Sequence, residues 1–84
     1  MTDRRKAVER DLAVAAEQLA HLADEADEAR LRALVSETPL AEQEHREAER
    51  HAEAMRRHHG ELLEQLQQLE QAQDDLLDRL VAAT

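Results

Sequence analysis

The sequence predicts an all-helical protein, an antiparallel hairpin of two coiled-coil helices. The 84 residues include no Phe, Tyr, Trp or Cys and only one Gly and one Pro, so they lack both the large side chains of a compact core and the residues that break helices. Small and apolar residues recur at gaps of alternately four and three residues in two long segments, which is the spacing of a coiled-coil seam. A single break, Ser36-Glu37-Thr38-Pro39, separates the segments.

The first predicted helix covers about residues 3–35. Thr2 or Asp3 can cap its start, because a side-chain oxygen there accepts a hydrogen bond from a free backbone N–H group. Its predicted seam consists of Val8, Leu12, Ala15, Leu19, Leu22, Ala26, Ala29 and Ala33. An eleven-residue period that runs through Ala23, Arg30 and Leu34 fits about as well, and it would straighten the supercoil near the end of this helix.

The second predicted helix covers about residues 39–82 and has a longer seam. Thr38 suits the cap position and Pro39 the first helical position, because proline lacks the N–H group that is free there. The seam consists of His45, Ala48, Ala52, Met55, His59, Leu62, Leu66, Leu69, Gln73, Leu76 and Leu80. Gly60 lies inside this segment and follows basic residues, as at a helix end. Because the seam keeps its phase across Gly60, we favour one continuous helix over two, with a three-helix chain as the alternative.

The predicted turn, residues 36–38, is short enough to make the helices antiparallel neighbours. A turn centred near residue 37 pairs seam positions of the two helices: Ala33 with Ala41, Ala26 with Ala48, Leu19 with Met55, Leu12 with Leu62, and Val8 with Leu66. Four apolar residues surround the turn: Leu31, Leu34, Val35 and Leu40. We favour a closed cluster that staples the turn shut. The alternative is an exposed apolar tip that contacts a partner.

The unequal lengths of the two helices predict an interface. In the register above, the first helix covers the second only to about residue 71, yet the apolar pattern continues to Val81. The predicted hairpin core is Val8, Leu12, Leu19, Leu22, Ala26, Ala48, Ala52, Met55, His59, Leu62 and Leu66. The predicted dimer or partner interface is Leu63, Leu69, Gln73, Leu76, Leu77, Leu80 and Val81. We therefore predict a homodimer of hairpins that forms a four-helix bundle, with the relative direction of the hairpins left open.

Charge and hydropathy disfavour two classes of partner. The formal net charge of -9 argues against direct nucleic-acid binding, which relies on clustered Lys and Arg. No apolar run approaches the roughly 20 residues that span a bilayer, and the charged start MTDRRKAVERD does not resemble a signal peptide. We expect a cytoplasmic protein that binds neither membrane nor nucleic acid.

The five histidines are the candidates for ligand chemistry. No two of them have the spacing of three or four residues that places two metal ligands on one helical face. His21, His51 and His58 are the remaining metal candidates, from different positions in the hairpin, and we expect no metal or other cofactor. His45 and His59 fall in the seam, where they form either a polar layer that fixes the register or a layer that loosens when protonated.

The sequence contains no set of residues in a recognised catalytic arrangement. It has no glycine-rich phosphate loop and no Cys, and its single Ser lies in the turn. We therefore expect a non-enzymatic coiled-coil interaction module, a self-associating adaptor or scaffold. One alternative is a transcription regulator that binds a sigma factor or polymerase through Arg46, Arg50, Arg56 and Arg57. Another is a metal or small-ligand sensor that uses the segment 45–59.

Overall fold

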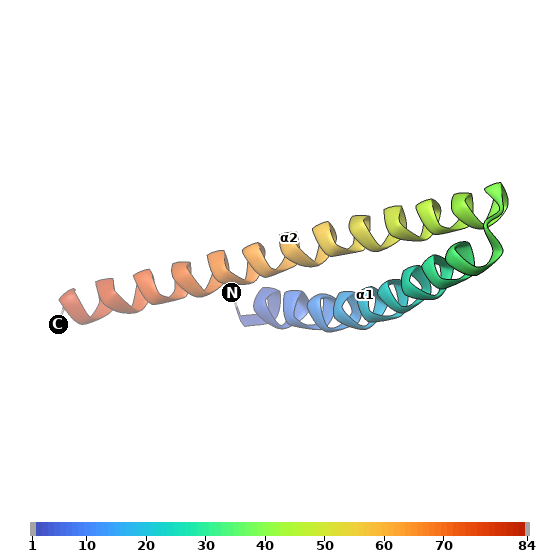
Figure 1. Cartoon of the computed structure of the whole chain (residues 1–84). Helices are drawn as coiled ribbons and strands as arrows, with labels where there is room; N and C mark the ends of the chain where they lie inside the picture. The colour runs from blue at the N-terminus through green and yellow to red at the C-terminus, as the bar shows by residue number, and fades with distance from the viewer. Residues whose placement is uncertain (1, 84) are drawn as a thin grey trace.

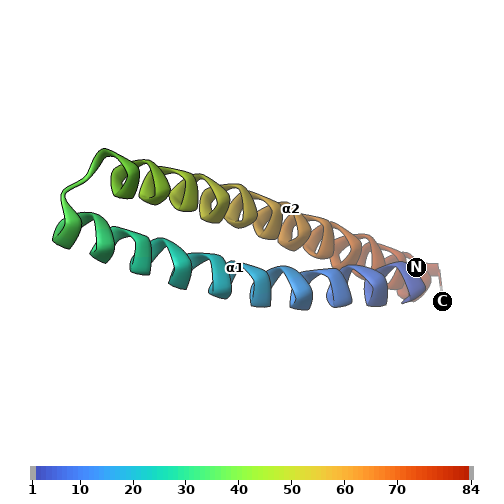
Figure 2. The same ribbon diagram turned by 90° about the vertical axis from the view of Figure 1, so that its right-hand side faces the viewer.

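The computed structural model describes residues 2–83; Met1 and Thr84 lie outside the described residues. The described chain consists of two helices, α1 (Thr2–Ser36) and α2 (Pro39–Ala83). They run antiparallel and form a rod with extents of 70 × 16 × 12 Å (Figure 1). Figure 1 shows α2 continuing well past the start of α1, and Figure 2 shows the same two helices and the turn from another side. The prediction of an all-helical hairpin is confirmed for these residues.

The face that α1 turns toward α2 follows the predicted seam of four-three spacing. Val8, Ala15, Ala26, Ala29 and Ala33 are buried, each at most 6% exposed. Leu12, Leu19 and Leu22 are half-buried. Arg30 and Leu34, which the eleven-residue period would place in the seam, are exposed. The heptad alignment therefore describes α1 along its whole length.

The corresponding face of α2 is covered over most of its length. Ala41, Ala52 and Leu62 are buried. The half-buried seam residues are His45, Ala48, Met55, His59, Leu66, Leu69 and Gln73. Because only one other helix is described, this burial comes from packing against α1. Small residues dominate the seam near the turn and leucines dominate it farther away, so the apolar area per layer grows with distance from the turn.

Helix α2 runs through Gly60 without a break, so the described chain has two helices rather than three. The seam explains why, because Met55 and Leu62 pack on the same side of α2 before and after the glycine. A Cβ atom built on Gly60 meets nothing within 4 Å. The position therefore has room for a side chain.

Gly60→Ala is expected to raise the free energy of unfolding by about 1 kcal/mol. Alanine restricts the unfolded backbone more than glycine does, and the new methyl group contacts nothing. Denaturant unfolding followed by circular dichroism measures this change. A loss of stability would show that α2 needs the flexibility of glycine at this point.

Backbone geometry and one side chain close the turn between the helices. Glu37 adopts a left-handed conformation with φ of 53°, and its N–H donates to the carbonyl oxygen of Ala33 at 3.1 Å, which closes the end of α1. The Ala41 N–H then donates to Oγ1 of Thr38 at 3.2 Å. This is the N-cap contact expected from the Thr38-Pro39 pair.

Thr38→Ala is expected to lower the free energy of unfolding by about 1 kcal/mol, because the Ala41 N–H loses its acceptor at the start of α2. Thr38→Ser keeps a hydroxyl oxygen at the same place and serves as the matched control, with little change expected. Thermal unfolding of both variants distinguishes loss of the cap from loss of the threonine methyl group.

Glu37→Gly is expected to stabilise the hairpin by up to about 1 kcal/mol. A left-handed φ is unfavourable for a residue with a Cβ atom, and glycine adopts it without steric strain. The larger freedom of glycine in the unfolded chain offsets part of this gain. Glu37→Ala keeps the Cβ atom and is expected to give no such gain, so equal stabilisation by both variants would contradict the conformational explanation.

The apolar residues around the turn do not form the closed cluster that we favoured from the sequence. Leu31, Leu34, Val35 and Leu40 are 56%, 64%, 85% and 65% exposed. The seam positions on either side of the turn are Ala33 and Ala41, so these larger residues lie on the outer faces of the helices. A two-residue connection supplies no further chain to cover them. The exposed apolar tip, which was our alternative, describes this end of the rod.

Candidate functional site

The region of interest begins where α1 stops covering α2. Nη1 of Arg5, in the second turn of α1, donates to Oε1 of Gln73 at 3.3 Å, and Nε of the same guanidinium donates to Glu9 at 3.1 Å. Gln73 is half-buried, and every residue from Asp74 to Ala83 is exposed. We call residues 74–83 the overhang. The break in coverage lies about two residues beyond the position expected from the sequence.

The overhang carries four large apolar side chains, which we call the overhang patch: Leu76, Leu77, Leu80 and Val81. They are 45%, 52%, 65% and 74% exposed. At 100° per residue, this spacing of one and four residues places them on one side of the helix. Leu76 and Leu80 continue the seam, whereas Leu77 and Val81 widen the apolar face to one side of it. The remaining charged positions of the overhang are Asp74, Asp75, Asp78 and Arg79.

The other three residues of the predicted interface lie before the overhang. Leu63 is 38% exposed and lies beside the seam. Leu69 and Gln73 are half-buried on the face that packs against α1. The structure therefore brings four of the seven predicted residues together in the overhang patch, and it places two of the others within the hairpin.

A second group of exposed apolar side chains lies at the opposite end of the rod. This group, the tip patch, consists of Leu31, Leu34, Val35 and Leu40. The sequence offered one signal for it, because all four residues lie off the four-three spacing of the seam. Between the two ends, the large apolar side chains that are exposed in the described chain are Val14 and Leu63. Exposed apolar surface is therefore concentrated at the ends of the rod.

The histidines do not assemble into a metal site. Within residues 2–83, no three His, Cys, Asp or Glu side chains form a group that could hold a metal ion. Nε2 of His21 lies 3.0 Å from Oε1 of Glu25, and Nε2 of His45 lies 3.5 Å from Oε1 of Glu49. Both are contacts to the next turn of the same helix. His58 is exposed and His59 half-buried.

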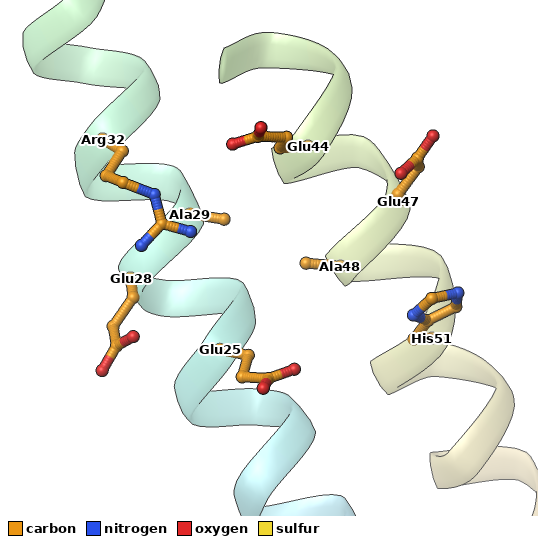
Figure 3. Close-up of a pocket in the computed structure, with 8 residues that line it drawn as sticks. All are labelled: Glu25, Glu28, Ala29, Arg32, Glu44, Glu47, Ala48 and His51. Carbon is orange, nitrogen blue, oxygen red and sulfur yellow. The ribbon is translucent and has the colours of Figure 1, made fainter. Parts of the chain in front are cut away.

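A groove between the helices lies over the small residues of the seam. Its volume of about 350 Å³ falls within the range of small-molecule sites. Its lining residues are Glu25, Glu28, Ala29, Arg32, Glu44, Glu47, Ala48 and His51. Ala29 and Ala48 point toward one another across the groove, whereas Glu28 and Glu47 point away from it (Figure 3). Glu25 and Glu44 extend from opposite helices toward the space between them (Figure 3).

The four arginines of the transcription-regulator alternative are all exposed on α2. Arg56 pairs with Glu53 one turn earlier. Glu47, Glu49 and Glu53 lie among the arginines in the sequence. The middle of α2 therefore presents charges of both signs and no purely basic surface.

The fold and these surfaces define a helical hairpin whose exposed large apolar side chains gather mainly at its two ends. No family model, curated protein or solved structure matches the chain. Neither described helix includes a stretch that is apolar enough, over the length required, to span a membrane.

Proposed function

We propose that this protein is a non-enzymatic coiled-coil interaction module that associates with itself through the overhang. The observation that carries the proposal is the overhang patch, in which Leu76, Leu77 and Leu80 are 45–65% exposed. Contiguous apolar side chains on a helix that has lost its partner helix favour association with another helix. A second copy of the chain supplies such a helix with the same apolar face.

The energetics favour a weak, concentration-dependent dimer. The side chains of the overhang patch are 45–74% exposed, so complete burial contributes about 1 kcal/mol for each, or on the order of 8 kcal/mol for the eight side chains of a dimer. Loss of translational and rotational freedom opposes association by about 4–15 kcal/mol. The dimer therefore needs additional contacts beside the patch, and its dissociation constant is expected to be micromolar or higher.

The polar residues that line the groove at Ala29 and Ala48 are four glutamates, one arginine and one histidine, with no Ser, Thr, Cys or Lys nucleophile among them, which favours an interaction role. Catalysis needs reactive groups held against one another in a site that excludes water. A thin rod with most of its charged residues exposed supplies helix faces for contacts with other proteins. We therefore place its function in adaptor or scaffold assembly.

Sedimentation equilibrium of the 84-residue chain, from low micromolar to near-millimolar concentration, tests the proposal. The average mass is expected to rise with concentration from that of one chain to that of two. A mass that stays at one chain across the whole range would refute self-association.

A further inference from the structure

Building on the proposed self-association, we infer that the second copy docks antiparallel and end to end, overhang against overhang. The two rods would then overlap only over residues 74–83 and point their turns in opposite directions. The contact would join two helices, in place of the four-helix bundle expected from the sequence. Three features support this arrangement: the spacing of the apolar residues in the overhang, the distribution of apolar surface along the rod, and the distribution of charge.

The overhang patch has the same spacing when it is read in either direction. Leu76 and Leu77 precede Asp78-Arg79, and Leu80 and Val81 follow them. An antiparallel copy centred between residues 78 and 79 places Leu77 of one copy level with Leu80 of the other. It also places Leu76 level with Val81. The patch is therefore complementary to itself in the antiparallel direction, as a two-fold symmetric contact requires.

The overhang patch also leaves room for the start of α1. Leu77 is turned about 100° around the helix axis from Leu76, so the patch extends away from the seam that α1 occupies. The overhang of a second copy can then lie along this face and end next to the start of α1. Side-by-side packing over the whole rod has less support, because Val14 and Leu63 are the large exposed apolar residues between the two ends of the described chain.

The charges of the overhang favour antiparallel docking over parallel docking. The overhang carries Asp74, Asp75 and Asp78 against a single Arg79. Parallel docking places each aspartate level with the same aspartate of the second copy, where like charges repel. Antiparallel docking separates Asp74 and Asp75 of one copy from those of the other along the rod, and it places Asp78 of each copy level with Arg79 of the other. The short overlap also keeps most of the net charge of -9 on each chain apart.

Small-angle X-ray scattering at a concentration that populates the dimer measures the expected shape. Two rods of 70 Å that overlap by ten residues, about 15 Å, give a maximum dimension of about 125 Å. Side-by-side packing in either direction gives about 70 Å. A dimer with the shorter dimension would overturn end-to-end docking and leave the proposed self-association intact.

Energy transfer between labelled copies tests the direction independently. The chain has no native Cys, so Gln43→Cys near the turn and Asp74→Cys in the overhang each give one labelling site. End-to-end antiparallel docking places the two residues 43 more than about 100 Å apart and the two residues 74 about 15 Å apart along the rod. Transfer is therefore expected from the Asp74→Cys pair and not from the Gln43→Cys pair.

The remaining outcomes are equally decisive. Transfer between Gln43→Cys labels would show that the turns lie together, and it would overturn antiparallel docking. A mass that grows past two chains would indicate contact between the overhang of one copy and the tip patch of the next, which forms open chains, and it would overturn the closed dimer. A mass of one chain refutes the proposed function itself, so the two failures are distinguishable. Sedimentation of each labelled variant confirms that the label leaves the mass unchanged.

Discussion

Leu76→Glu combined with Leu80→Glu is expected to weaken dimerisation at least a hundredfold, which corresponds to about 2.7 kcal/mol. The two leucines are 45% and 65% exposed in the hairpin, and in the dimer each would pack against the second copy. The substitutions remove their apolar contacts and place four carboxylates in one short interface, where desolvation and mutual repulsion both oppose docking. Sedimentation equilibrium at matched concentrations measures the change.

The matched control for this variant is Leu34→Glu with Leu40→Glu. These tip leucines are 64% and 65% exposed, so the control makes the same two substitutions on surfaces of similar exposure and adds the same charge. It is expected to leave the mass distribution unchanged. If both variants dissociated the dimer, the cause would be the added net charge. This result would contradict a specific contact at the overhang.

Leu62→Ala is expected to lower the free energy of unfolding by about 2–3 kcal/mol. Leu62 is 6% exposed and is the most deeply buried leucine of the described chain, so its truncation leaves a cavity in the leucine-rich part of the seam. Domains of this size have little stability to lose. Thermal and denaturant unfolding are best measured in the Leu76→Glu, Leu80→Glu background, where dimerisation does not contribute to stability.

Leu63→Ala provides the control, because it removes the same atoms from the next residue of the same helix. Leu63 is 38% exposed and lies beside the seam, so the expected loss is below about 1 kcal/mol. Equal losses at the two positions would show that the seam is not the main source of stability. A larger loss at Leu63 would place the packed face on the other side of α2.

The sequence predicted the fold because heptad spacing and burial have the same physical cause. A helix that packs against one neighbour buries residues at gaps of four and three, and the described seam follows those positions from Val8 to Ala33 on α1. Thr38 and Pro39 predicted the start of α2 in the same way, through the missing N–H of proline and the hydroxyl acceptor of threonine. The overhang followed from the difference in helix length.

Two features of the turn region were not predicted from the sequence. The left-handed residue at the end of α1 is Glu37, whereas sequence signals for this conformation rely on glycine or asparagine. The exposure of the tip patch was signalled only by the seam spacing, which leaves Leu34 and Leu40 outside the packed face, whereas hydrophobicity alone favours burial. The exact end of coverage at Gln73 also depends on the reach of the long Arg5 side chain.

The unbroken helix α2 from Pro39 to Ala83 fixes the distance between the two ends of the rod. Leu40 of the tip patch and Leu80 of the overhang patch are separated by about 60 Å of continuous helix. Deleting one heptad from each helix would shorten this spacing by about 10 Å and keep both patches on their original faces. Deleting five residues from each would rotate one patch by about 140° relative to the other. Two proteins bound at the tip patch and the overhang patch would therefore be held at a fixed distance and at a fixed angle about the helix axis.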